Sequence, residues 1–387
     1  MNYSVDIVGF GRIWRKFVMF IPLIILLLSC NKGNSFTVNG TVSNLKNQEV
    51  LISYIHSDNI VLDTVRAKAN GKFSYKNDID TLTSFSFYFN DHAASVVVFA
   101  NPKDAITIKG DASVPDLIKV SGNTVNDELT DFKEQNKELL AYRAVLLENY
   151  INSHLERNSS AQDKILSEND DLIKINAVNR ELVLNAEAYI EKYPARFSSL
   201  ILVNEFFANP ENQKSFERMM EMLQGDILKT KMALDLKNYL NKISRSAEGT
   251  SMPYFQLIDM KGDTLTSYDF KGKHLLLSFV SATGVDSHEN IETLKEIYEN
   301  VNRDSVEFIS VYIDANIPSS LKHIENDSLR WSAVAEKNSW AADVVDAYSI
   351  EFVPNNILIS PEGIISDRNI SAMALKDKLS KTSINMY

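Results

Sequence analysis

The sequence predicts a multidomain protein with an N-terminal antiparallel β-sandwich, a helical middle region and a C-terminal α/β region. Short runs that alternate apolar and polar residues between Asn, Asp and Gly turns fill residues 36–120, as is typical of sandwich strands. Apolar residues at helical spacing mark residues 121–247. Residues 248–387 alternate strand-like apolar runs with amphipathic helices, which indicates a central sheet packed against helices.

The composition excludes one class of partner. The chain has 387 residues, enough for two or three domains, and its 44% hydrophobic and 24% charged residues are those of a globular protein. Its formal net charge is −11. Because nucleic-acid affinity depends on clustered Lys and Arg that neutralise phosphates, the sequence predicts no nucleic-acid partner.

The chain contains a single cysteine, Cys30. Without a second cysteine it can form no internal disulfide and carry out no dithiol chemistry. The histidines are scattered and none is spaced from another as metal ligands are. They are His56, His92, His154, His274, His288 and His323. The 13 glycines are dispersed and form no phosphate-binding loop, so we expect neither a metal nor a cofactor.

The first thirty residues have the pattern of a signal peptide. Basic residues precede an apolar run from Phe17 to Leu28. Twelve residues at about 1.5 Å each reach roughly 18 Å, too short for a hydrocarbon core of about 30 Å. We therefore interpret residues 1–30 as a signal peptide rather than a transmembrane helix.

The apolar run ends in Leu27-Leu28-Ser29-Cys30, which resembles a bacterial lipobox. The resemblance implies diacylglycerol on the Cys30 thiol, cleavage before Cys30 and acylation of the new N-terminus, which together anchor the chain in a lipid bilayer. Residues 31–35 then form a short tether. Asn31, rather than Asp, favours the outer membrane facing the periplasm by analogy with other lipoproteins. The alternative is an ordinary signal peptide with an incidental cysteine.

Several short motifs in residues 36–120 and just after them resemble a small β-domain of unknown function, which often precedes thioredoxin-like domains in exported lipoproteins. The matching pieces are Val38–Val42, Leu62–Val65, Gly71–Phe73 and Gly122–Glu128. Asn70-Gly71 is expected to form a hairpin turn.

In the helical region, one helix is expected over about residues 161–193, ending at Pro194. Glu and Lys residues of this region are interpreted as a solvated face and not as a site. The Phe206-Phe207 pair and the methionines Met219, Met220 and Met222 are interpreted as core rather than as a ligand-binding group.

The order of elements in the C-terminal region is informative. The apolar run Leu275–Val280 predicts a buried central strand, and a helix follows it after a loop. Val306–Ile313 is the next buried strand, and Val353-Pro354 precedes a hairpin. This order resembles the thioredoxin-like fold, in the branch of membrane-anchored TlpA/ResA-type thiol–disulfide oxidoreductases and their AhpC/TSA relatives.

In that family the central strand ends in a segment with a Cys-x-x-Cys motif that opens the first long helix. Here Phe279–His288 match the segment, and Gly284 falls where the nucleophilic cysteine belongs. Ser287 falls where the resolving cysteine belongs. Val353-Pro354 matches the family's cis-proline loop, which contacts bound peptide.

The missing thiols decide the expected chemistry. The reaction needs a thiolate, which neither Gly284 nor the hydroxyl of Ser287 supplies, so neither a dithiol cycle nor a sulfenic acid can form at this site. Asp286, Ser287 and His288 are adjacent and point in different directions, so no catalytic triad is expected. Asp286 or Ser287 is interpreted as the helix N-cap.

The sequence therefore predicts a lipid-anchored envelope protein with a degenerate, non-catalytic thioredoxin-like domain. We expect it to bind an envelope polypeptide or partner protein in a groove formed by Thr283, Gly284, Val353 and Pro354. Two alternatives remain open. One is a thiol–disulfide oxidoreductase or peroxiredoxin-like enzyme, and the other is a purely structural lipoprotein.

Overall fold

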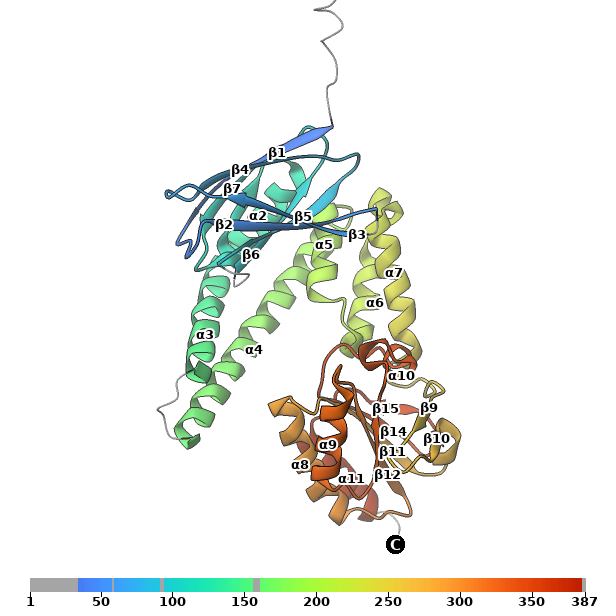
Figure 1. Cartoon of the computed structure of the whole chain (residues 1–387). Coiled ribbons are helices and arrows are strands. Elements are labelled where there is room, and N and C mark those ends of the chain that lie inside the picture. Colours follow the sequence, from blue (N-terminus) through green and yellow to red (C-terminus); the bar gives the residue numbers. More distant parts are fainter. Residues whose placement is uncertain (1–33, 58, 91–93, 156–160, 385–387) are drawn as a thin grey trace, which may run out of the picture. The chain divides into compact units, whose positions relative to one another are not determined.

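The computed structural model describes residues 34–57, 59–90, 94–155 and 161–384 (Figure 1). The predicted signal peptide, Cys30 and most of the tether lie outside the described residues. Among the described helices, none has the length and apolar character needed to cross a membrane. The chain divides into two compact units, Met1–Leu182 and Val183–Tyr387.

The first unit contains two four-stranded sheets packed face to face. One sheet has the strand order β4-β1-β7-β8 and the other β3-β2-β5-β6. The strands are β1 (Ser35–Ser43), β2 (Glu49–His56), β3 (Asn59–Arg66), β4 (Lys72–Asp78), β5 (Thr83–Phe89), β6 (Ala94–Ala100), β7 (Ala105–Asp111) and β8 (Lys119–Ser121). The ring of Phe36 in β1 lies 4.7 Å from that of Phe85 in β5, within one buried cluster. The predicted β-sandwich is confirmed.

Strand β1 shows why these residues form a sandwich strand. Phe36, Val38 and Val42 are buried and residues 37, 39 and 41 are more exposed, so the side chains alternate with a period of two. Gly40 also faces the core, where a Cβ atom would lie 2.1 Å from the ring of Phe73. The glycine therefore makes room for the aromatic side chain of the neighbouring strand.

One strand pair departs from the predicted antiparallel arrangement. β1 and β7 pair in parallel, with Val38 opposite Ile106, whereas the other pairs in these two sheets are antiparallel. A parallel pair requires a long crossover connection. Strands β2 to β6, which the chain builds between β1 and β7, supply this connection.

The turn at Asn70-Gly71 forms, but it does not close a hairpin. The Gly71 N–H donates to the Lys68 carbonyl at 2.8 Å, and Gly71 has φ +73°, a conformation that favours glycine. The turn joins β3 to β4, which belong to different sheets. The predicted turn is therefore present, but the prediction of a hairpin is wrong, because the two strands that the turn connects do not pair with each other.

Helices α2 (Thr124–Gln135) and α3 (Lys137–Leu155) follow the sandwich, and α4 (Ala161–Lys192) runs from the first unit into the second. The predicted stop of α4 just before Pro194 is confirmed. The second unit continues with α5 (Phe197–Phe206), α6 (Gln213–Met222) and α7 (Lys231–Ile243). Phe207 and Met219 are buried, as predicted for core residues, whereas Phe206, Met220 and Met222 are only partly buried.

The C-terminal part of the second unit contains a five-stranded sheet of order β13-β12-β11-β14-β15 (Figure 1). The strands are β11 (His274–Val280), β12 (Val306–Tyr312), β13 (Ser332–Ala335), β14 (Asn355–Ile359) and β15 (Ile365–Asp367). β11, β12 and β13 are parallel, and β14 runs antiparallel to β11. This mixed sheet confirms the predicted α/β thioredoxin-like region.

Both faces of this sheet are buried. Leu275, Leu277 and Phe279 of β11 belong to one core cluster and Leu276 and Val280 to another. The first cluster includes residues of α10 (Asp343–Ala347) and of β9 (Gln256–Ile258), which pairs with β10 (Thr264–Thr266). The second includes residues of α8 (Val285–Asn300), α9 (Ile317–Asp327) and α11 (Ala372–Ile384). Strand β11 is thus the predicted buried central strand.

Candidate functional site

The candidate site lies at the carboxyl end of β11, where residues 281–284 lead into α8. β14 runs antiparallel to β11 with Asn355 opposite Phe279, so Pro354 comes next along this register, beside Val280. The Val353–Pro354 peptide bond is cis, as the family resemblance implies. The sheet therefore brings the loop before α8 and the Val353–Pro354 segment to the same edge.

One carboxylate holds the loop. Asp314, just past the end of β12, accepts a hydrogen bond from Ser281 Oγ at 2.6 Å on one oxygen. Its other oxygen accepts from the Ala282 N–H at 2.8 Å and from Ser320 Oγ at 3.0 Å. Asp314 was not predicted from the sequence, although an aspartate just after a predicted buried strand could have indicated it.

The helix after the loop begins earlier than predicted. Gly284 is the N-cap of α8 and Val285 its first residue, so the expectation that Asp286 or Ser287 caps the helix is wrong. Ser287 is only 2% exposed, and its Oγ accepts a hydrogen bond from the Ser281 N–H at 3.0 Å. The Ser287 hydroxyl therefore ties the helix to the preceding loop.

The backbone around Gly284 and Ser287 has the spacing of a cysteine pair. A Cβ atom on Gly284 would lie 3.6 Å from the Ser287 Cβ, and disulfides have Cβ–Cβ distances of about 3.5–4.5 Å. Gly284 has φ −82° and ψ 127°, an extended conformation open to other residues. Nothing in the backbone requires glycine here, so only the side-chain atoms of a dithiol pair are missing.

Apolar side chains surround this edge. Thr283 is exposed, and Gly284, Val353 and Pro354 are partly exposed. The nearby Val285 and Phe352 are exposed large hydrophobic residues.

Trp340 adds a further apolar side chain to the same edge. It is 49% exposed and lies in the 3₁₀ helix η6 (Ser339–Ala341). Ser339 Oγ holds this turn by donating to the Ile313 carbonyl at the end of β12. Sequence analysis missed Trp340, because only the fold places its turn there.

A buried ion pair lies directly beyond the cis-proline. Asn355 Nδ2 donates to Glu211 Oε1 at 3.0 Å, and Arg368 donates to both oxygens of the same carboxylate at 3.3 Å. Arg368 also donates to the carbonyls of Ser246 and Tyr348. Glu211 belongs to the helical region, whose charges were predicted to form a solvated face. That prediction is wrong for Glu211, because its partner lies 157 residues further along the chain.

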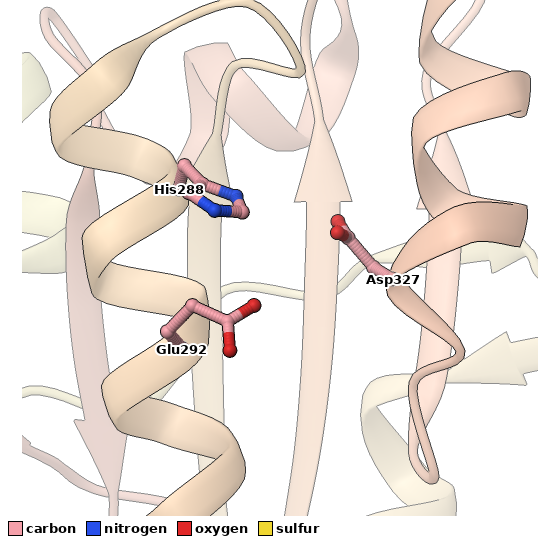
Figure 2. A group of neighbouring side chains, drawn as sticks. All are labelled: His288, Glu292 and Asp327. Atoms are coloured by element: carbon pink, nitrogen blue, oxygen red, sulfur yellow. The ribbon is translucent and has the colours of Figure 1, made fainter.

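A second group of side chains meets on the surface beside α8. Figure 2 shows His288 and Glu292 of α8 and Asp327 of α9 pointing toward one another. One ligand atom from each lies within 4.8 Å of the others. Sequence analysis compared only histidine with histidine and so overlooked the i, i+4 spacing of His288 and Glu292. Ser287 is buried while His288 is exposed, so these adjacent residues have different surroundings.

Comparison with known families agrees with this geometry. Residues 249–368 match the model of the AhpC/TSA family. The C-terminal region is an AhpC/TSA-type thioredoxin-like domain. Residues 36–129 match a domain of unknown function (DUF4369). Both resemblances predicted from the sequence are thereby confirmed.

The curated relatives of the AhpC/TSA-type domain are thiol–disulfide oxidoreductases. The thiol-disulfide oxidoreductase ResA of Geobacillus kaustophilus is 24% identical over 140 residues, which are 36% of this chain and 79% of the relative. ResA of Bacillus cereus is 21% identical over 127 residues, which are 33% of this chain and 72% of the relative.

Two solved structures are also similar. The C-terminal domain of a putative thiol-disulfide oxidoreductase from Bacteroides thetaiotaomicron is 27% identical, with 35% of this chain and 96% of that chain covered and a TM-score of 0.34. A thioredoxin-like protein from Bacteroides caccae is 17% identical, with 59% and 87% covered and a TM-score of 0.42. The AhpC/TSA-type domain of this chain carries no cysteine, since the single Cys30 precedes it.

Proposed function

We propose that the AhpC/TSA-type domain is a non-catalytic relative of the thiol–disulfide oxidoreductases, a pseudo-enzyme that binds an envelope polypeptide or partner protein. The observation that carries this proposal is the Gly284–Ser287 pair, which keeps the spacing of a dithiol and lacks both sulfur atoms. Thiol–disulfide exchange proceeds by attack of a thiolate on a disulfide sulfur. The Ser287 hydroxyl is buried and accepts a hydrogen bond from the Ser281 N–H, and it cannot replace a thiolate.

The surroundings of the pair support binding. Val285 and Phe352 expose apolar surface next to Gly284 and to the cis-proline segment, and Trp340 exposes apolar surface on the turn that Ser339 holds at the end of β12. Extended peptides bind exposed backbone groups through main-chain hydrogen bonds, and apolar contacts to their side chains provide specificity. A polypeptide segment with apolar side chains is therefore the ligand that this edge fits best.

The envelope location rests on the sequence of residues 1–30. We propose that Cys30 is acylated and anchors the protein in a lipid bilayer, in the outer membrane facing the periplasm. Palmitate fed to cells should label the full chain and should not label a Cys30→Ser variant. Equal labelling of the two chains would contradict the anchor.

Catalysis is tested by insulin reduction with dithiothreitol as the reductant, and by peroxide consumption. The full chain should show no rate above the uncatalysed reaction in either assay. The Gly284→Cys, Ser287→Cys double variant serves as a matched control, because its thiols would sit at disulfide spacing, and it should gain insulin reduction. The similarity to ResA favours the alternative of an active oxidoreductase or peroxiredoxin-like enzyme, and turnover by the unaltered chain would establish it.

Binding is tested by crosslinking in the native envelope followed by partner identification. A Phe352→Asp variant and a Val353→Asp, Pro354→Ala double variant should lose the crosslinked partner. Met373→Asp, which changes an exposed apolar residue of α11, is the control and should retain it. If both groove variants keep every partner, the groove has no role and the purely structural lipoprotein is favoured.

A further inference from the structure

Three side chains of metal-ligand type converge between α8 and α9 (Figure 2). His288 and Glu292 are exposed and Asp327 is partly exposed, so ions from solvent can reach them. One nitrogen or oxygen atom from each lies within 4.8 Å of the others. Zinc bonds to such atoms at about 2.0–2.2 Å, so small side-chain rotations would complete a site.

Packed elements set the spacing of the three residues. His288 and Glu292 are four residues apart on α8 and therefore share one face of the helix. Asp327 is the last residue of α9. Both helices contribute to the same buried cluster, through residues such as Ile291 and Ile324. The ligands are thus carried by well-packed helices, as a preorganised site requires.

Each carboxylate is oriented by a second residue. The Tyr312 hydroxyl donates to Asp327 Oδ2 at 2.9 Å, and Lys295 Nζ donates to Glu292 Oε1 at 2.7 Å. Outer hydrogen bonds of this kind hold metal-ligating carboxylates in place and leave the second oxygen of each free.

The local charge favours a cation. Asp327 ends α9, and the carboxyl end of a helix carries partial negative charge. Within the described part of the chain, no hydrogen bond or ion pair joins His288, Glu292 and Asp327 to one another. Two carboxylates and an imidazole therefore face a common point, and Lys295 neutralises one of the two carboxylate charges there.

We propose that His288, Glu292 and Asp327 bind a divalent transition-metal ion of the zinc class, with water in the remaining positions. Imidazole nitrogen suits Zn²⁺, Cu²⁺, Ni²⁺ and Fe²⁺, whereas Mg²⁺ and Ca²⁺ prefer oxygen ligands alone. Three protein ligands and an open position are a common arrangement for zinc. This proposal rests on His288, Glu292 and Asp327, and the polypeptide-binding proposal on Thr283, Gly284, Val353 and Pro354, so either proposal can fail without the other.

Binding is measured by equilibrium dialysis and calorimetry with ZnCl₂, on the full chain purified in detergent without a polyhistidine tag. We expect one Zn²⁺ per chain. His288→Ala and Asp327→Asn should each weaken binding by about tenfold or more, and Tyr312→Phe should weaken it roughly tenfold through loss of the orienting hydroxyl. His56→Ala and Glu289→Gln change exposed residues outside the group and should bind as the unaltered chain does.

Substitution with Co²⁺ gives a second readout. Visible absorption of bound Co²⁺ should appear in the unaltered chain and disappear in His288→Ala, while far-ultraviolet circular dichroism confirms that the variant is folded. Failure of the unaltered chain to bind Zn²⁺ saturably, or equal affinity in the folded His288→Ala variant, would overturn the proposal.

Discussion

Gly284 and Ser287 differ from a dithiol pair in their side chains alone, since Gly284 has no side chain and Ser287 carries oxygen in place of sulfur. The Ser287 hydroxyl occupies a position that disulfide geometry permits, and it accepts a hydrogen bond from the loop where a thiol would otherwise react. Oxygen at position 287 holds the loop, and a dithiol site would need sulfur at both position 284 and position 287. The thioredoxin-like fold is present here without these sulfur atoms, so the fold alone does not supply thiol chemistry.

His274 gives a residue-scale prediction on pH. Burial lowers the pKa of its imidazole, and Nδ1 has no hydrogen-bond partner among the described residues. The unfolded chain keeps a pKa of about 6.5 and so binds more protons than the folded chain just below that pH. The free energy of unfolding should therefore fall as the pH falls from 8 through about 6.5.

Urea unfolding at pH 8, 6.5 and 5.5 measures this effect. His274→Gln cannot take up the proton and should lose less stability than the unaltered chain over this range. His56→Gln, at an exposed position, should follow the unaltered chain. Arg218 lowers the pKa of Glu187, so protonation of carboxylates of this kind reduces the free energy of unfolding only at lower pH. Parallel pH dependence of the unaltered chain and His274→Gln would exclude His274 as the cause.

At the scale of elements, the sequence predicted features that depend on neighbouring residues better than it predicted the pairing of distant strands. The apolar run of β11 and the stop of α4 before Pro194 depend on neighbours in sequence, and both predictions are correct. The parallel pairing of β1 with β7 depends on a crossover that no local pattern reports. The start of α8 was also predicted wrongly. Ser287 Oγ accepts a hydrogen bond from the Ser281 N–H of the loop, and Gly284 is the N-cap instead.

The candidate site was predictable in part. The family resemblance pointed to Gly284, Ser287 and Val353-Pro354, which the fold brings to one edge of the sheet. Asp314 was missed because its partners lie about thirty residues away. The contacts of Glu211 and the convergence of His288, Glu292 and Asp327 were missed because they join residues that lie far apart in the sequence.

The ion pair of Arg368 with Glu211 provides a prediction for the contact between elements. Arg368 and Glu211 have side-chain exposures of 3% and 13%, so the pair joins the η2 turn (Pro210–Asn212) to the sheet away from water. Removing one partner of a buried pair leaves an uncompensated charge. Arg368→Met should therefore lower the free energy of unfolding by about 3–5 kcal/mol.

Urea denaturation followed by tryptophan fluorescence measures the loss. The matched control is the ion pair of Lys229 with Asp226, whose side chains are 81% and 94% exposed. Lys229→Met should change the free energy of unfolding by less than about 1 kcal/mol, because exposed pairs contribute little. Adding Glu211→Leu to Arg368→Met should recover part of the loss, since it removes the stranded carboxylate. Equal losses for the two single variants would show that burial of the pair does not matter.

At the scale of the whole molecule, composition and pattern were sufficient to predict three successive regions of different type. The buried cluster of the sandwich draws its members from residues 36–120, and the two clusters of the AhpC/TSA-type domain draw theirs from residues 255–379. The division into two compact units falls within α4, so the helical region contributes to both. The sequence gives no sign of this division, because α4 is continuous.

Separate cores predict separate unfolding. Phe87 is buried in the sandwich, and Phe87→Ala should destabilise that core by about 3–5 kcal/mol. Trp331 and Trp340, the tryptophans of the described residues, lie in the AhpC/TSA-type domain and report on it. In heat or urea, the variant should lose sandwich structure earlier by circular dichroism while its tryptophan transition stays in place. Val311→Ala, in the core of the second unit, should move the tryptophan transition instead. If Phe87→Ala shifts both signals together, the two units unfold as one cooperative structure.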